Sequence, residues 1–175
     1  MVFLDESGFM LQPVVRRTWA PRGQTPIHYS WDRRDRLSAI SAISVSPKRR
    51  HLGLYFDIVD HNIATDDVES FVADLLRRLG RPILLVLDRW SVHRSAAKRL
   101  HRRFSRRISV EWLPAYAPEL NPDEQVWRQS KYGDLANFIP DDVLELGRAL
   151  ADSIQQTRRN PRLLRSFFEY AQLTL

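Results

Sequence analysis

The feature that most constrains the fold of this 175-residue sequence is the unbroken run of five apolar residues 83–87, which ends in Asp88. A strand that is apolar on both faces must be covered on both faces, which is typical of the centre of an α/β sheet. A carboxylate that ends such a buried run needs a specific partner for its charge. The run therefore predicts a layered α/β fold with a functional acid at the end of a central strand.

The rest of the apolar pattern predicts a mixed sheet covered by helices. Strands are expected at residues 2–4, 37–45, 52–59, 83–87 and 108–113, and the first of them is expected to run into a turn at Ser7-Gly8. Residues 16–35, rich in Arg, Pro and Gly, predict a loop or ribbon on the surface. The order of elements is three strands, helix, strand, helix, strand and further helices, which predicts an α/β fold with a mixed sheet.

Helix signals fill the intervals between these strands. Apolar residues at helical spacing predict a helix capped by Thr65 and closed by Gly80, and a basic helix is expected over residues 95–104. Asn121 is placed as an N-cap with Pro122 at the first helical position. From Pro140 onward, final helices are expected to turn these residues inward: Val143, Leu144, Leu146, Leu150 and Ile154. No repeat or linker divides residues 1–175, so they are predicted to form a single domain.

Composition excludes several classes of site. The chain has no cysteine, which excludes disulfides, thiolate zinc sites and cysteine nucleophiles and suits a reducing compartment. The longest apolar run is five residues, and the N-terminus has no basic stretch followed by an apolar core. We therefore expect neither a membrane-spanning segment nor a secretion signal.

Positive charge is concentrated in one segment. The chain carries 27 Lys and Arg against 21 Asp and Glu, a net charge of +6. Eight of the basic residues and none of the acidic ones lie in residues 89–107, so the remainder is close to neutral. Clustered Arg and Lys displace counterions from phosphates, which favours nucleic acid as a partner, although a solvated helix face explains the charge equally well at this point.

Three acids fall where an α/β fold gathers functional groups: Asp5 after the first strand, Asp88 after the central strand, and Glu124 in the first turn of a helix. Converging carboxylates hold Mg²⁺ or Mn²⁺, and two such ions support in-line phosphoryl transfer. Each acid also has a structural alternative. Glu124 occupies a capping-box position relative to Asn121, and Asp5 could be an ordinary turn acid, whereas the functional interpretation leads for Asp88.

These acids stand in motifs that resemble a known family. The motifs are residues 3–9 (Phe-Leu-Asp-Glu-Ser-Gly-Phe), Asp88 with His93 five residues on, and residues 113–127 (Leu-Pro-Ala-Tyr-Ala-Pro-Glu-Leu-Asn-Pro-Asp-Glu-Gln-Val-Trp), with 35 residues between Asp88 and Glu124. Together they resemble the DDE transposases, and the last block is similar to the signature of bacterial insertion-sequence transposases related to the mariner elements. The resemblance covers nearly the whole chain.

The resemblance implies a ribonuclease H-like fold and metal-dependent hydrolysis at the ends of a mobile element, followed by strand transfer by the freed 3′-hydroxyl. By motif position, Asp5, Asp88 and Glu124 are the catalytic triad and the ligands of two Mg²⁺ or Mn²⁺ ions. Double-stranded DNA is the implied partner, with a homodimer in synapsis and a bacterial, cytoplasmic, nucleoid-associated location. Phosphate contacts are expected from these residues: Arg89, His93, Arg94, Lys98, Arg102 and Lys131.

The sequence also departs from the family pattern. Arg89-Trp90 stands where a small polar pair is usual, and Asp123 stands where an aliphatic residue is usual. Because Asp123 points about 100° around a helix from Glu124, we interpret it as a spare acid and not as a ligand. His93 is compatible with a phosphate contact, with ordering the site, or with a purely structural role. Trp127 is interpreted as core.

The front of the chain holds no helix-turn-helix pattern before the first strand. We therefore expect the DNA-reading segment to be a separate polypeptide, an upstream reading frame, or a lost or trimmed region. Two alternatives to a transposase remain open: a domesticated remnant that binds DNA without catalysis, and a structure-selective nuclease of the same fold.

Overall fold

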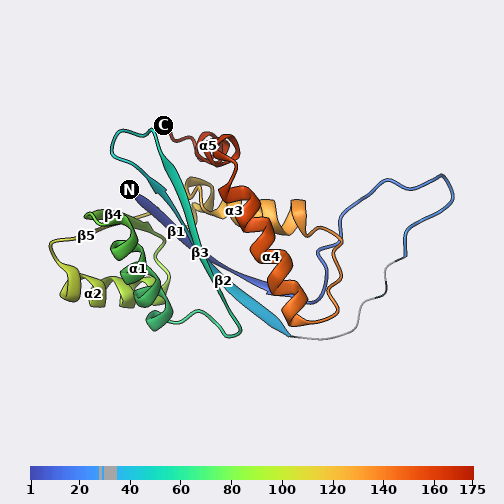
Figure 1. The fold of residues 1–175 in the computed structure, drawn as a ribbon, viewed down its shortest axis with the longest axis horizontal. Coiled ribbons are helices and arrows are strands. Elements are labelled where there is room, and N and C mark those ends of the chain that lie inside the picture. Colours follow the sequence, from blue (N-terminus) through green and yellow to red (C-terminus); the bar gives the residue numbers. More distant parts are fainter. Residues whose placement is uncertain (28, 30–34) are drawn as a thin grey trace.

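A five-stranded sheet forms the centre of the protein (Figure 1), as seen in a computed structural model that describes residues 1–27, 29 and 35–175. The strand order is β3-β2-β1-β4-β5. Strands β1 (Val2–Met10), β2 (Arg36–Val45) and β3 (Leu52–Val59) are antiparallel neighbours. Strands β4 (Ile83–Leu87) and β5 (Ile108–Trp112) run parallel to β1. The predicted α/β class with a mixed sheet is confirmed.

Helices cover both faces of this sheet, as the apolar run in β4 requires. Helices α1 (Thr65–Leu79) and α2 (Ser91–Phe104) pack on one face, where a buried cluster includes Val2, Leu4 and Leu85. Helices α3 (Glu124–Gln129), α4 (Val143–Arg158) and α5 (Pro161–Tyr170) pack on the other, around a cluster that includes Phe3 and Trp127. A short 3₁₀ turn (Pro118–Leu120) precedes α3, and a π-helical turn (Ser130–Asp134) follows it.

Strand β1 decides which functional side chains face which helices. Successive side chains of a strand point to opposite faces. Val2 and Leu4 belong to the α1/α2 side and Phe3 to the α3/α4 side. By the same alternation Asp5 faces α3, whereas Glu6 faces α2. Two adjacent residues of β1 therefore place one carboxyl on each side of the sheet.

Several predicted boundaries are wrong, each for an identifiable reason. The turn at Ser7-Gly8 is absent, because β1 continues to Met10 in an unbroken ladder with β2 that outweighs the local turn preference. Helix α2 begins at Ser91, four residues before the predicted start. Leu144 is 61% exposed, because the buried stripe of α4 follows Leu146, Leu150 and Ile154.

The predicted caps also differ from the observed ones. Ala64 and not Thr65 caps α1, and its N–H is bound by the Asp67 carboxylate at 2.7 Å, whereas Gly80 ends the helix in the left-handed region as predicted. Helix α3 starts at Glu124, because Asn121 caps the preceding turn by accepting from the Asp123 N–H at 3.1 Å. No hydrogen bond from the Glu124 side chain to the Asn121 backbone is formed in the described structure, so the capping-box alternative for Glu124 is not supported.

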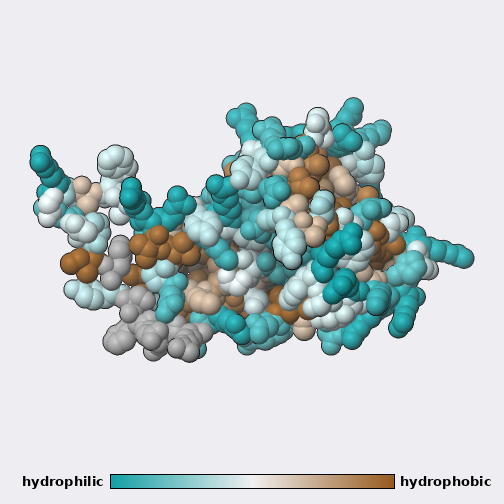
Figure 2. Space-filling model, turned by 180° about the vertical axis from the view of Figure 1, so that it is seen from behind, coloured by the Kyte–Doolittle hydropathy of each residue, from teal (hydrophilic) through white to brown (hydrophobic). Residues whose placement is uncertain are grey.

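An irregular segment between β1 and β2 projects from the body of the fold, which fits the surface loop or ribbon predicted for residues 16–35 (Figure 1). Val15, Trp19 and Ile27 are exposed along it. Hydrophobic atoms are visible on the projecting part of the space-filling view (Figure 2). The part of that prediction that concerns residues 28 and 30–34 lies outside the described residues. None of the described helices is long and apolar enough to cross a membrane.

Candidate active site

The three predicted acids come from three different elements and meet at one cavity. Asp5 lies within β1, Asp88 follows β4 directly, and Glu124 is the first residue of α3. Pairing of Phe3 with Val86 in the parallel β1–β4 ladder brings Asp5 level with Asp88. All three acids line a cavity of about 400 Å³, together with Arg89, Trp90, Asn121 and the loop of residues 113–118.

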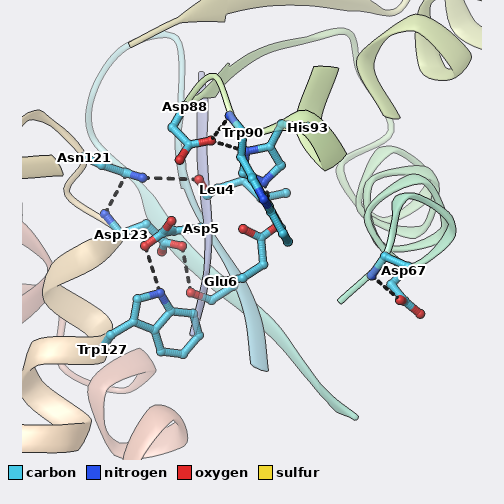
Figure 3. A network of polar contacts seen from close by, with 12 residues as sticks. Leu4, Asp5, Glu6, Asp67, Asp88, Trp90, His93, Asn121, Asp123 and Trp127 are labelled. Carbon is cyan, nitrogen blue, oxygen red and sulfur yellow. Dashed lines mark hydrogen bonds and ion pairs between the residues drawn. The ribbon is translucent and has the colours of Figure 1, made fainter. Parts of the chain in front are cut away.

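Asp5 stands in a crowded field of negative charge (Figure 3). Burial raises the pKa of its carboxyl well above the ordinary range, and a hydrogen bond with Glu124 and the charges of Asp123, Glu124 and Glu6 add to the rise. The Trp127 indole Nε1 donates to Asp5 Oδ2 at 3.1 Å from a ring that is 2% exposed. Trp127 is therefore core, as predicted, and it also holds the Asp5 carboxylate in place.

Asp88 is held by a buried histidine that also binds Glu6 (Figure 3). His93 Nδ1 lies 2.5 Å from Asp88 Oδ1, and Nε2 lies 2.7 Å from Glu6 Oε1. The Trp90 N–H donates to the same Asp88 oxygen at 2.9 Å, so within this network Oδ2 is left without a donor. Hydrogen bonding from His93 lowers the pKa of Asp88, burial opposes the effect, and the Trp90 N–H reinforces it.

His93 itself is charged by this arrangement. Burial alone would lower its pKa, but the hydrogen bonds to Asp88 and Glu6 and their charges raise the pKa to about 9. The structure contradicts the predicted DNA contact by His93, because its side chain is 1% exposed and both ring nitrogens are engaged. The alternative that His93 orders the site fits this placement.

Asp123 lies beneath the cavity and does not line it. Its side chain is fully buried, Oδ2 accepts from the Ser41 hydroxyl at 2.7 Å, and Oδ1 has no hydrogen-bond partner among the residues that the structure describes. Burial raises the pKa of Asp123 well above the ordinary range, and the charges of Glu6 and Glu124 add to the rise. The interpretation of Asp123 as a spare acid, outside the ligand set, agrees with this position. A neighbouring amide closes the floor of the cavity: Asn121 Nδ2 donates to the Leu4 carbonyl at 3.2 Å.

The donor set fits a divalent cation. Three carboxylates line one cavity, and burial, together with hydrogen bonding and the charges of the neighbouring acids, raises the pKa of Asp5. Hard oxygen donors of this kind suit Mg²⁺ or Mn²⁺. Among the residues that the structure describes, no three His, Asp or Glu side chains converge closely enough to form a complete metal site as they stand. The assignment of the triad as metal ligands therefore stays a prediction.

The basic segment after Asp88 divides into two faces of α2. Arg99 and Arg103 form ion pairs with Asp66 and Glu69 of α1. These two cations therefore link α2 to α1. In the described part of the chain, no carboxylate lies within ion-pair distance of the cations on the other face, Arg94, Lys98 and Arg102.

The unpaired cations line a groove of about 940 Å³ between α2 and the edge strand β5, and Arg89 lines both this groove and the acid cavity. Lys131 approaches from the opposite layer. Its ammonium lies 5.1 Å from the centroid of the Phe9 ring. Burial lowers its pKa against the opposing influence of Glu124 and Asp5.

Sequence reasoning missed Glu6 and Ser41 as parts of the site. A detectable signal for Glu6 is its place directly after Asp5 in a strand, which sends it to the opposite face toward α2. Ser41 gives no such signal, because it reaches Asp123 only through the pairing of β1 with β2.

Comparison with known proteins identifies a family for this chain. The model of the DDE superfamily endonuclease family matches residues 1–143. The chain belongs to the DDE superfamily endonucleases. A search of curated proteins finds no significant match.

Solved transposase structures share the fold of this DDE superfamily endonuclease. The Mos1 mariner paired-end complex with Mn has 17% sequence identity and a TM-score of 0.67, over 98% of this chain and 53% of that chain. The paired-end complex with Mg has 16% identity and a TM-score of 0.65 over the same shares. The Mos1 strand transfer complex has 16% identity and a TM-score of 0.58, again over 98% and 53%.

These likenesses show the ribonuclease H-like transposase fold that the motifs predict. The chain spans about half the length of the transposases that it resembles.

Proposed function

We propose that this chain is the catalytic domain of a metal-dependent DNA transposase related to the mariner elements and to bacterial insertion sequences. In this proposal it hydrolyses phosphodiester bonds at the ends of an element and supports strand transfer by the freed 3′-hydroxyl. The observation that carries the proposal is the meeting of Asp5, Asp88 and Glu124, from three elements, in one cavity beside a basic groove.

In this proposal the three acids would hold Mg²⁺ or Mn²⁺, which when bound would supply the positive charge that favours an attacking oxygen and a leaving oxygen. The chain's own residues position the acids and the DNA. Trp127 and His93 hold the carboxylates of Asp5 and Asp88 in place. Phosphate contacts from the α2 groove and from Lys131 position the duplex without reading its sequence.

Partners follow from the same proposal. The paired-end complexes of Mos1 favour double-stranded DNA as substrate and a homodimer that joins two ends. A helix-turn-helix segment, on this or another polypeptide, supplies recognition of the element's ends. The proposed setting is the bacterial nucleoid.

The test is a nicking assay on supercoiled DNA with Mg²⁺ or Mn²⁺. Asp88→Asn and Glu124→Gln, which keep the side-chain size and remove the charge, are expected to abolish nicking and to leave salt-sensitive DNA binding largely intact. Asp152→Asn, on the outer part of α4, is the matched control and should nick normally. Full activity of either triad variant would refute the triad.

A second assay separates the two alternatives that share the fold. A transposase joins pre-cut ends that carry a 3′-hydroxyl to a target DNA, whereas a structure-selective nuclease cuts without joining. A remnant does neither, although it still binds DNA.

A further inference from the structure

Two exposed aromatic side chains line the cavity that holds the three acids, and neither takes part in the core. Trp90 is 43% exposed and Tyr116 is fully exposed. Single exposed aromatics are ordinary on protein surfaces. These two differ from that background because both line the cavity that holds the acids.

Trp90 is fixed relative to Asp88. Its backbone N–H donates to Asp88 Oδ1 at 2.9 Å. Its ring meets the His93 ring edge to face, with centroids 5.5 Å apart and planes at 87°. His93 is buried and bound to the same Asp88 oxygen (Figure 3). Trp90 is therefore linked to Asp88 both by its backbone N–H and by the contact of its ring with His93. The side chain that replaces the usual small polar residue is therefore an ordered wall of the cavity.

Tyr116 belongs to a different segment of the cavity lining, the loop of residues 113–118. Its φ of +58° lies in the left-handed region, which costs a residue with a side chain on the order of 1 kcal/mol. Pro114 and Pro118 restrict the loop on either side of it. The loop thus keeps a strained residue whose ring stands in solvent at the cavity instead of packing inside.

The chemistry of the cavity lining indicates which ligand would contact these two rings. The cavity offers carboxylates for a cation-bound phosphate, the Arg89 guanidinium for a neighbouring phosphate, and apolar wall residues such as Leu113. A nucleobase attached to such a phosphate has a flat π face, and stacking on an aromatic side chain accepts any base. In the interior of a duplex both faces of a base are covered by its neighbours, so an internal base can stack here only after it leaves the helix.

We propose that Trp90 and Tyr116 form a stacking platform for an unpaired base of the DNA strand whose phosphodiester lies at the three acids. The platform makes locally unpaired DNA, at a frayed or distorted strand end, the preferred substrate of the site. This inference rests on the proposed function and specifies the state of its substrate.

The experiment compares binding of two labelled DNAs that differ only in pairing. One is a fully paired duplex, and the other is the same duplex with two unpaired bases at one position; anisotropy in Ca²⁺, which oxygen donors also bind, gives both dissociation constants. Stacking on an aromatic ring contributes about 1–3 kcal/mol per base, so wild type should favour the unpaired DNA by about five- to 150-fold. Trp90→Ala and Tyr116→Ala should each reduce this ratio at least several-fold.

Matched variants separate stacking from a general loss of structure. Trp90→Phe and Tyr116→Phe keep a ring and should retain most of the preference. Tyr170→Ala removes a half-exposed aromatic of α5 that is absent from the cavity lining and should leave the ratio unchanged. Thermal melting confirms that each variant folds.

Equal affinity of wild type for the two DNAs, or a preference that survives in both alanine variants, overturns the platform. Nicking by wild type together with equal affinity overturns the platform alone. Absence of both DNA binding and metal-dependent nicking overturns the proposed function as well.

Discussion

The hydrogen-bonded chain Glu6–His93–Asp88, in which the imidazole is buried, predicts a specific dependence of stability on pH. The two ring nitrogens of His93 each contact a carboxyl oxygen, and both nitrogens can donate only when the imidazole is protonated. The pKa of His93 is about 9 in the folded protein, against an ordinary value near 6.5 in the unfolded chain. A folded-state pKa that is raised stabilises the protein fully below the unfolded value, and the stabilisation is lost as pH rises through the folded value.

The magnitude follows from the same two values. The full difference corresponds to about 3 kcal/mol in the free energy of unfolding. The Asp88 side chain is 52% exposed, so solvent screens that half of the network, whereas Glu6 is only 10% exposed. We therefore expect about 2–3 kcal/mol of stability to disappear between pH 6.5 and pH 9.5 in metal-free protein.

Urea unfolding in EDTA at intervals from pH 6 to pH 10 measures this loss. Other acids of the site also titrate, so the decisive quantity is the difference between wild type and His93→Gln at each pH. That difference should shrink by about 2–3 kcal/mol across the range. His101→Gln, the same change at an exposed position of α2, should run parallel to wild type. Parallel curves for wild type and His93→Gln would show that His93 is not a buried imidazolium, and the account of its charge would be wrong.

Three further predictions concern metal, DNA and the buried acid. Mg²⁺ or Mn²⁺ at about 100 times its dissociation constant should add about 2.7 kcal/mol to the free energy of unfolding and raise Tm by roughly 5–10 °C. The gain should vanish in Asp88→Asn. An equal gain in wild type and variant would show that the ion binds elsewhere. Alanine at each of the three unpaired cations of the α2 groove should reduce the slope of log DNA-binding constant against log salt concentration by about 1. Alanine at the two cations paired with α1 should change that slope much less. The reverse order would show that DNA binds the other face of α2. Asp123→Asn removes a buried carboxyl of raised pKa. As pH rises from 4 to 8, the free energy of unfolding of the variant should therefore increase relative to that of wild type, on the order of 1–3 kcal/mol. A constant difference between the two proteins in urea unfolding would contradict this. The groove cations are Arg94, Lys98 and Arg102, and the paired ones are Arg99 and Arg103.

Local sequence predicted the elements well where one physical preference dominates. The run Ile83–Leu87 is strand β4 and is covered on both faces, because no other arrangement removes its apolar side chains from water. Gly80 ends α1 because its left-handed conformation suits a residue without Cβ. Local preference failed at Ser7-Gly8, where nine pairings with β2 outweigh the turn, and at Leu144, where burial is decided by the neighbours of α4.

What the sequence alone determined is the set of chemical groups and the family: three motif acids, their order along the chain, the basic segment after Asp88, and a mixed sheet under helices. The tertiary structure decided how those groups divide. It turned Asp5 and Glu6 to opposite faces of one strand and buried His93 between two carboxylates. It also paired two cations of α2 with acids of α1 and left the other three along a groove. The reason is that charge, exposure and pKa depend on neighbours brought from distant parts of the chain, and spacing along the sequence does not specify those neighbours.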